Sequence, residues 1–368
     1  MTDIDILTHA LCRFYGFSHA VLVGRARSGL VALSDVLGLA GKVAVIPSNI
    51  CPVVVAALDA AGVTLRLAPV DAVSGLAEDD QIVATMSASP QAGMVMPTHL
   101  YGKLATYRDS CALAARAGWF VLENDTLCAA RVMTGERRAF GDALLTSFGY
   151  AKTASAGSGG AIVTDDAALA AELRRAVASW PTLDSKAAAV EQSLMLVRRH
   201  LRLLGCPGLG QGMLAVEQQH LRHSFPPALA PTVLSALEQV PLTLERRAMV
   251  AERWGKALER FSQHLATSAV PVTAPWRLIR SVTMPSLRDP LVHALREQGV
   301  DAGTNFPSLT ESFPDLLGGQ KSLQADSWSA SVVNLWLDDA YTPERIQSAM
   351  NIVQRVFHER ELTNVPCQ

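Results

Sequence analysis

The chain has 368 residues, and its 32 Lys plus Arg against 34 Asp plus Glu give a formal charge of −2 at pH 7. This balance argues against a nucleic-acid-binding protein, which needs a basic face, and against a polybasic membrane anchor. Hydrophobic residues make up 49% and charged residues 18%, a composition that excludes a disordered chain and suits buried strands and an apolar subunit interface.

The first half of the chain alternates short apolar runs with helical patterns. We predict strands at residues 43–46, 64–68, 93–96, 119–123, 144–148 and 161–164. Helical spacing predicts helices at residues 53–61 and 107–117, which end at Gly62 and Gly118. Strands that alternate with helices form βαβ units, so the predicted fold class is α/β with a mainly parallel sheet. Such sheets bind ligands beyond the carboxyl ends of their strands.

The second half has a different pattern. Gly and Pro residues predict a loop-rich stretch at residues 197–212, and a long helix is predicted at residues 232–262. The last hundred residues mix expected strands (280–284, 332–337) with expected helices (291–298, 343–359). We therefore predict a large domain at residues 1–240 and a smaller C-terminal α+β domain at residues 241–368.

Targeting and redox features are few. No run of 18 apolar residues occurs, and the longest candidate, residues 53–70, is interrupted by Asp59 and Arg66, so no membrane span is expected. The N-terminus has no basic start before an apolar run, which argues against a signal peptide. The six cysteines form no CxxC pair, which is typical of reduced thiols rather than of disulfides or a zinc site. We expect a cytoplasmic protein without a metal ion.

One group of residues suggests covalent chemistry. The segment Ser147-Phe148-Gly149-Tyr150-Ala151-Lys152 follows a predicted strand, and Gly157-Ser158-Gly159-Gly160 comes shortly after it. Desolvation at the end of a buried strand would lower the pKa of Lys152 and free its amine for a Schiff base. An ordinary surface lysine is the alternative.

Two further segments could bind a cofactor that has a phosphate group and a positively charged ring nitrogen. Ser28-Gly29-Leu30 opens a helical run, where backbone N–H groups and a hydroxyl can hold a phosphate, although such a turn is often only a helix cap. Glu123-Asn124-Asp125 ends an apolar strand, where a carboxylate could meet a ring nitrogen. A cap or a solvated loop is the alternative for these acids.

Taken in order, these residues resemble the DegT/DnrJ/EryC1/StrS family of sugar aminotransferases, which depend on pyridoxal 5'-phosphate (PLP) and have fold type I. The resemblance covers roughly residues 10–355, and its strength lies in six motifs in the right order. These are Ser28-Gly29, Pro47-Ser48, Pro97-Thr98-His99-Leu100-Tyr101-Gly102, Glu123-Asn124-Asp125, Ser147 to Lys152, and Gly157 to Gly160.

The resemblance implies roles for individual residues. Lys152 would carry the PLP Schiff base and move the proton between the carbons of substrate and cofactor. Ser28, Gly29, Leu30 and Ser147 would contact the cofactor phosphate, and Arg222 would contact the phosphate of a partner subunit's cofactor. Cys51 would lie at the cofactor ring, where many members have an aromatic residue. His99 and Tyr101 would contact the substrate.

The carboxylate for the ring nitrogen is ambiguous. In a gapless alignment from Gly118 the family's Asp falls on Asn124, and Asp125 comes one residue later. Successive strand residues point to opposite faces, so Asp125 would need a bulge to face the ring. We predict Asp125, because transamination needs a charge at this nitrogen. Asn124 is the alternative.

The function implied is a PLP-dependent aminotransferase. It would move an amino group from a donor such as glutamate to a ketone on a sugar or sugar-like acceptor, as a homodimer with shared active sites. Two alternatives remain: a PLP enzyme of the same fold that catalyses elimination or decarboxylation, and a PLP-fold regulator with little turnover.

Overall fold

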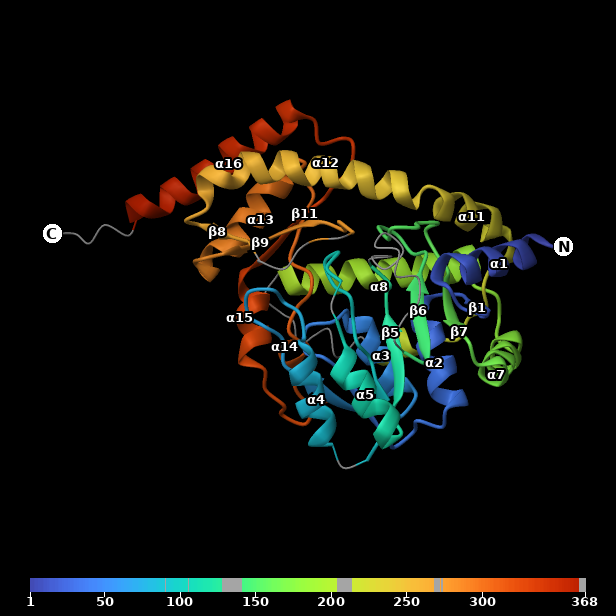
Figure 1. The fold of residues 1–368 in the computed structure, drawn as a ribbon. Helices are drawn as coiled ribbons and strands as arrows, with labels where there is room; N and C mark the ends of the chain where they lie inside the picture. The colour runs from blue at the N-terminus through green and yellow to red at the C-terminus, as the bar shows by residue number, and fades with distance from the viewer. Residues whose placement is uncertain are drawn as a thin grey trace.

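The computed structural model describes residues 1–89, 91–104, 106–127, 141–203, 214–267, 272 and 274–363. Figure 1 shows a large sheet surrounded by helices and a smaller sheet beside it, with the long helix α12 (Val240–Leu258) running across the top of both. Within this described part, no helix has the length and apolar character needed to cross a bilayer.

The large sheet has seven strands in the order β1-β7-β6-β5-β4-β2-β3. Only β7 runs antiparallel to its neighbours, so the prediction of a mainly parallel sheet is confirmed. All six strands expected in this half are present, whereas the short strand β1 was not predicted. The strands are β1 (His19–Val23), β2 (Val43–Pro47), β3 (Thr64–Ala68), β4 (Met94–Val95), β5 (Phe120–Asn124), β6 (Ala143–Ser147) and β7 (Gly160–Thr164).

Helices cover both faces of this sheet. One face carries α2 (Ala26–Val36), α3 (Pro52–Ala60) and α7 (Ala167–Ala178), and the other carries α1 (Asp3–Tyr15), α4 (Asp79–Ser87), α5 (Arg108–Ala117) and α11 (Ala230–Glu238). Strand residues alternate between the faces, as a period of two requires. Leu122 and Leu145 belong to the core under α2, while Val121 and Leu144 belong to the cores on the opposite face.

Two predictions for the middle of the chain need correction. The stretch expected to be loop-rich from residue 197 is helical to the end of α8 (Ser185–Leu203), and residues 204–213 lie outside the described part. The single helix expected at residues 232–262 is divided at Gln239 between α11 and α12. Pro241 lies in the first turn of α12. Since proline lacks an N–H and disrupts a helix interior, a helix boundary just before it is the stable arrangement.

The smaller sheet is antiparallel, with the order β10-β11-β9-β8. Its strands are β8 (Leu265–Ala266), β9 (Leu278–Val282), β10 (Ala302–Gly303) and β11 (Val332–Leu335), and it shares a core with α12, α13 (Arg288–Glu297) and α16 (Pro343–Thr363). The strands and helices predicted in the last hundred residues are therefore present with shifted ends.

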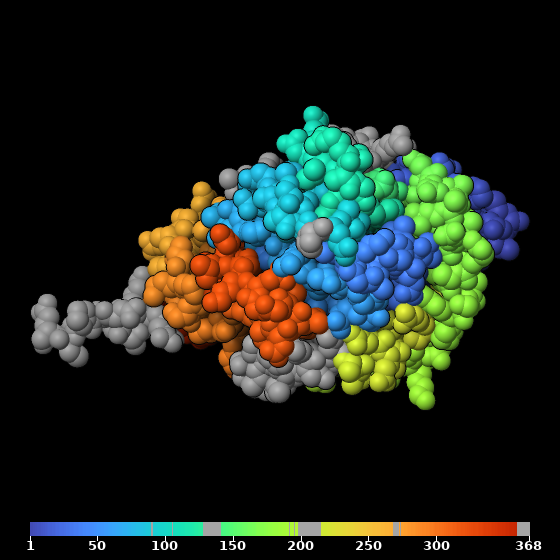
Figure 2. All heavy atoms as spheres, turned by 90° about the horizontal axis from the view of Figure 1, so that it is seen from below, coloured from blue at the N-terminus to red at the C-terminus, as the bar shows by residue number. Residues whose placement is uncertain are grey.

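Part of the C-terminal chain returns to the large sheet. Leu309 in α14 (Leu309–Ser312), together with Phe313 and Leu317, packs in the core beneath α2 and α3. Figure 2 shows the orange-red segment that contains α14 and α15 (Leu323–Ser331) lying against the blue N-terminal segments. The division into domains at residue 240 stays a prediction.

Candidate active site

The predicted site residues lie near one edge of the large sheet. Strands β1 to β6 all run in the same direction, because β7 is antiparallel to both β1 and β6. Their carboxyl ends therefore share one edge, where ligands bind in open α/β sheets. Asn124 ends β5 and Ser147 ends β6, while Ser28, Cys51 and His99 follow the ends of β1, β2 and β4.

Lys152 lies on a tight turn after β6. Its backbone N–H donates to the carbonyl oxygen of Gly149 at 3.2 Å, and Ser147 Oγ accepts from the N–H of Gly149 at 3.3 Å. Ala151, just before the lysine, has φ = 61°. From α12, Arg247 Nη2 donates to the carbonyl oxygen of Lys152 at 3.3 Å. The backbone of Lys152 is thus held both by its own turn and by Arg247 of α12.

The first turn of α2 fits a phosphate group. Ser28 is fully buried, and its Oγ has no hydrogen-bond partner in the described part of the structure. A buried hydroxyl without a partner is uncommon, and first-turn N–H groups also lack intrahelical partners. A Cβ on Gly29 would lie 3.2 Å from Leu145, and the side chain of Leu30 is in the core. Ser28 can therefore bind a phosphate oxygen. The N–H of Gly29 already donates to the carbonyl oxygen of Arg25 at 3.2 Å, so the predicted phosphate contacts of Gly29 and Leu30 stay a prediction.

The segment around Arg222 contacts the residues at both ends of α2 in its own chain. The N–H of Gly24 donates to the carbonyl oxygen of His223 at 3.0 Å, and Arg222 Nη2 lies 3.2 Å from Asp35 Oδ2 in α2. This ion pair is about half exposed, so breaking it costs little. The predicted contact of Arg222 with a partner's phosphate stays a prediction, and it would require Arg222 to leave Asp35.

The ladder at the end of β5 is regular. Asp125 N donates to Leu145 O at 3.0 Å, which continues the parallel pairing of Asn124 with Leu145. On the other side of β5, Asn124 N donates to Pro97 O at 2.8 Å, as its parallel bridge with Thr98 requires. No bulge therefore separates Asn124 from Asp125. The pairing thus shows no bulge that would turn Asp125 toward the ring, and the choice between Asp125 and Asn124 stays a prediction.

The regular pairing shows which face of the large sheet the side chains at the end of β5 occupy. Asn124 shares its face with its partner Leu145, which packs under α2, the helix that carries Ser28. Glu123 shares the opposite face with Leu144. Asp125 is the first residue after β5, and continued alternation predicts the face of Glu123 for it. Asn124 and Asp125 are both almost completely buried. The structure therefore favours Asn124 as the residue on the phosphate side of the sheet.

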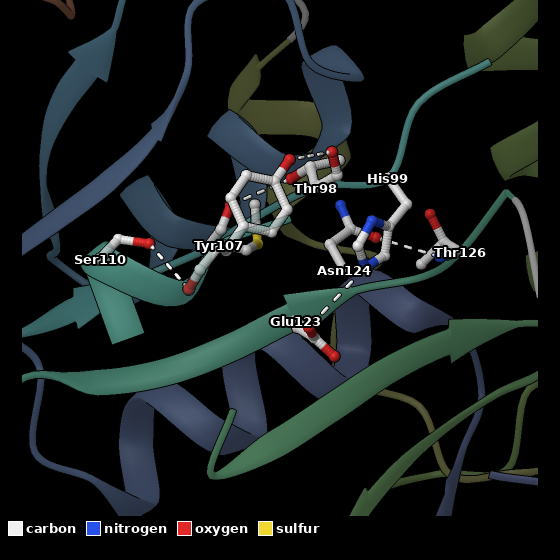
Figure 3. A network of polar contacts seen from close by, with 8 residues as sticks. Thr98, His99, Tyr107, Ser110, Glu123, Asn124 and Thr126 are labelled. Atoms are coloured by element: carbon white, nitrogen blue, oxygen red, sulfur yellow. Dashed lines mark hydrogen bonds and ion pairs between the residues drawn. The ribbon is translucent and has the colours of Figure 1, made fainter. Parts of the chain in front are cut away.

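A buried polar network surrounds this strand end (Figure 3). His99 Nε2 lies 3.8 Å from Glu123 Oε1, and both side chains are fully buried. Tyr107 packs its ring 5.6 Å from the His99 ring and donates from its hydroxyl to Thr98 O at 2.8 Å. The predicted substrate contact of His99 stays a prediction, and in this structure its side chain presents no exposed surface. Glu123 lies in the predicted Glu123-Asn124-Asp125 motif, but its contact with His99 was not predicted, and its place at a strand end was the only signal for it.

Tyr101 joins distant parts of the chain. Its side chain is fully buried, and its hydroxyl accepts hydrogen bonds from Phe306 N at 3.0 Å and from Trp328 Nε1 at 2.9 Å. The rings of Phe306 and Trp328 lie 6.1 and 5.6 Å from the Tyr101 ring. These contacts give Tyr101 a structural function, whereas its predicted contact with substrate stays a prediction.

Tyr101→Phe should lower the free energy of unfolding by about 2–4 kcal/mol, because two buried N–H donors would lose their acceptor. Urea unfolding measures this change. Tyr107→Phe is the matched control, since it removes a buried tyrosine hydroxyl that donates to one backbone carbonyl, that of Thr98. A loss for Tyr101→Phe no greater than that for Tyr107→Phe would contradict the assignment.

Two cavities that share Arg277 were not predicted, and one of them adjoins the Lys152 turn through Ala151. One, of about 240 Å³, is lined by Ala151, Arg247, Trp276, Arg277 and Trp336, among others. The other, of about 270 Å³, is lined by Lys103, Arg277 and Arg280, among others. Burial lowers the pKa of Lys103 to about 8, with Asp71 opposing the shift. Burial also lowers the pKa of Arg247, against the attraction of Asp338.

Comparison with known proteins gives a consistent result. Residues 3–354 match the sequence model described as the DegT/DnrJ/EryC1/StrS aminotransferase family. The aminotransferase TlmJ from Streptoalloteichus hindustanus superposes with a TM-score of 0.75 at 17% identity, over 98% of this chain and 92% of that one. DesI, solved in the presence of its TDP-sugar product, has a TM-score of 0.74 at 21% identity, over 98% and 86% of the two chains. NtdA from Bacillus subtilis, with bound pyridoxamine phosphate (PMP), has a TM-score of 0.71 at 16% identity, over 97% and 77%.

Proposed function

Since its sequence matches the family model over residues 3–354, the chain belongs to the DegT/DnrJ/EryC1/StrS aminotransferase family, and we propose that it aminates a ketone on a sugar or sugar-like ring. The family depends on PLP. The sugar assignment is supported by the fold shared with DesI, which was solved with a TDP-sugar product, and with PseC of Helicobacter pylori, an aminotransferase of pseudaminic acid biosynthesis.

The observation that carries the proposal for this site is the placement of Lys152 and Ser28 at one edge of the sheet. The buried Ser28 hydroxyl, which has no hydrogen-bond partner among the described residues, and Ser147 would hold the phosphate, with Gly29 and Leu30 in the same turn of α2. When bound, PLP supplies the electron sink and carries the amino group between donor and acceptor. Lys152 Nζ would take up and return the proton, and Cys51, at the start of α3, would flank the ring.

We also propose that the protein is a cytoplasmic homodimer with shared active sites. Support comes from large apolar side chains that remain exposed in the single chain, such as Tyr150 (72%), Val197 (47%) and Val216 (43%). Covering such surface is the usual reason for a subunit interface. Light scattering at micromolar concentration should give twice the mass of the chain, and a fully active monomer would contradict this proposal.

The identity of the amino acceptor can be tested with the PMP form of the enzyme. L-Glutamate should convert the PLP-loaded protein to its PMP form and release one 2-oxoglutarate per site. Adding a nucleotide-linked keto sugar or a keto cyclitol should then restore the PLP spectrum and yield an amino sugar or amino cyclitol by mass spectrometry. Recovery with simple 2-oxo acids, but with neither ring ketone, would show that the sugar-like acceptor is wrong.

A further inference from the structure

The turn that carries Lys152 has an unfavourable backbone conformation. Ala151, directly before the lysine, has φ = 61°. Residues with a Cβ rarely adopt this left-handed region, because the Cβ comes too close to the following carbonyl oxygen. Such a conformation persists only where surrounding contacts hold it, and it occurs most often at functional sites. The contacts made by residues 151–153 therefore bear on the direction of the Lys152 side chain.

An arginine of α12 makes two of these contacts. Arg247 Nη2 donates to the carbonyl oxygen of Lys152 at 3.3 Å, and Arg247 Nη1 donates to Thr153 Oγ1 at 3.5 Å. Thr153 Oγ1 in turn donates to the carbonyl oxygen of Leu127 at 3.0 Å. Arg247 is half-buried, where a cation is costly unless hydrogen bonds replace its lost hydration. One guanidinium thus links the lysine turn to the segment after β5.

The indole of Trp276 holds the residue before the lysine. Trp276 is almost completely buried, and its Nε1 donates to the carbonyl oxygen of Ala151 at 3.0 Å. The Trp276 ring stacks on Phe306 with ring centres 5.8 Å apart and an interplanar angle of 4°. The guanidinium carbon of Arg277 also lies 4.2 Å from the centre of the Trp276 ring. A ring packed against two flat neighbours cannot turn freely, so its N–H keeps its direction toward Ala151.

We propose that Arg247 and Trp276 are positioning residues for Lys152, and that they direct its amine toward the cofactor by holding the carbonyl oxygens of residues 151 and 152. This inference rests on the proposed function, because it takes Lys152 as the anchor of the cofactor. A side chain transfers a proton efficiently only at hydrogen-bond distance and in the right orientation. A turn released from these two donors would keep the Lys152 amine but lose its direction.

A double-mutant cycle separates positioning of Lys152 from a general effect on the fold. Arg247→Met removes both donors and keeps a long side chain. In the otherwise wild-type protein it should weaken PLP binding about 10-fold, because the covalent anchor forms less readily without these hydrogen bonds. In the Lys152→Ala background the same substitution should weaken PLP binding by less than about 2-fold, since no lysine remains to be positioned. Calorimetric titration of the apoproteins with PLP measures all four affinities.

Steady-state kinetics give an independent measurement. Arg247→Met should lower kcat about 10–100-fold and change KM for glutamate by less than about 3-fold, since a misdirected amine impairs proton transfer more than donor binding. Arg247→Lys keeps the charge and part of the donor set, and should recover part of the loss in kcat and in PLP affinity. Trp276→Phe keeps a stacked ring but removes the N–H, and should show the same pattern with a smaller effect.

Arg246→Met is the matched control. Arg246 is the adjacent residue of α12 and lines the cavity beside Ala151, and it pairs with Asp339 Oδ2 at 3.6 Å. Both partners of this ion pair are more than half exposed, so its loss should leave PLP affinity and kcat at their wild-type values. Circular dichroism should show that all variants are folded. If Arg247→Met does not fold, Arg247→Lys and Trp276→Phe decide the matter.

The outcomes separate this inference from the proposed function. Equal losses of PLP affinity from Arg247→Met with and without Lys152, or wild-type affinity in the Arg247 and Trp276 variants, overturns the inference even if amino transfer to sugars is found. If borohydride fixes the cofactor to a lysine other than Lys152, the inference is wrong together with the assignment of the anchor. The expected coupling between Arg247 and Lys152 without amino transfer to a ring ketone would overturn only the proposed function.

Discussion

Lys152→Ala should lower turnover by at least about 10³-fold while leaving the protein folded and able to bind PLP. The variant loses the only amine on the turn between Ser147 and Gly157, and with it both the covalent anchor and the group that moves the proton. The visible band of lysine-bound cofactor should be absent. Steady-state kinetics and an absorption spectrum of the PLP-loaded variant measure both effects.

Lys103→Met is the control for this experiment. Lys103 is the other lysine near the site, is almost fully buried, and has a pKa lowered to about 8, so it too could supply a free amine. Its Nζ donates to Ser74 O at 3.2 Å, which gives it a partner far from the β6 turn in the sequence. A normal cofactor band in Lys152→Ala and its loss in Lys103→Met would reassign the anchor to Lys103.

The motifs at the strand ends could be read from the sequence because they depend on local patterns. A short apolar run followed by Gly, Ser or Lys predicts the end of a strand from neighbouring residues alone, without knowledge of contacts between distant residues. In a parallel sheet all such ends share one edge, so Ser28, Asn124 and Ser147 are brought to the same edge by topology alone. The fold class followed from the same alternation.

Other features depend on contacts between distant residues. Arg277 meets Trp336 only because β9 pairs with β11 in one particular register, and no local pattern specifies that pairing. Tyr101 binds Phe306 and Trp328, which are more than 200 residues away. The absence of a bulge at Asp125 likewise depends on the neighbouring strands, whose hydrogen bonds hold β5 in a regular ladder.

The regular ladder changes what we expect at the ring nitrogen. Asn124, which shares its face with Leu145 and the α2 core, is now the better candidate, and its neutral amide cannot favour a protonated ring as a carboxylate would. Its Oδ1 accepts from Thr126 N at 3.2 Å, a bond that an aspartate at this position could keep. This chain would then transaminate slowly or perform chemistry that tolerates a neutral ring.

Asn124→Asp should therefore speed the reaction of the PLP-loaded enzyme with glutamate by about 10-fold or more, since the added carboxylate stabilises the protonated ring nitrogen. Asp125→Asn, on the opposite face, should change this rate by less than about 3-fold once corrected for the folded fraction, because no direct contact with the ring is lost. Stopped-flow absorbance measures both rates, and the pH dependence of the cofactor spectrum should shift in Asn124→Asp alone. If instead Asp125→Asn slows the reaction strongly and Asn124→Asp has no effect, Asp125 is the ring partner despite the regular strand.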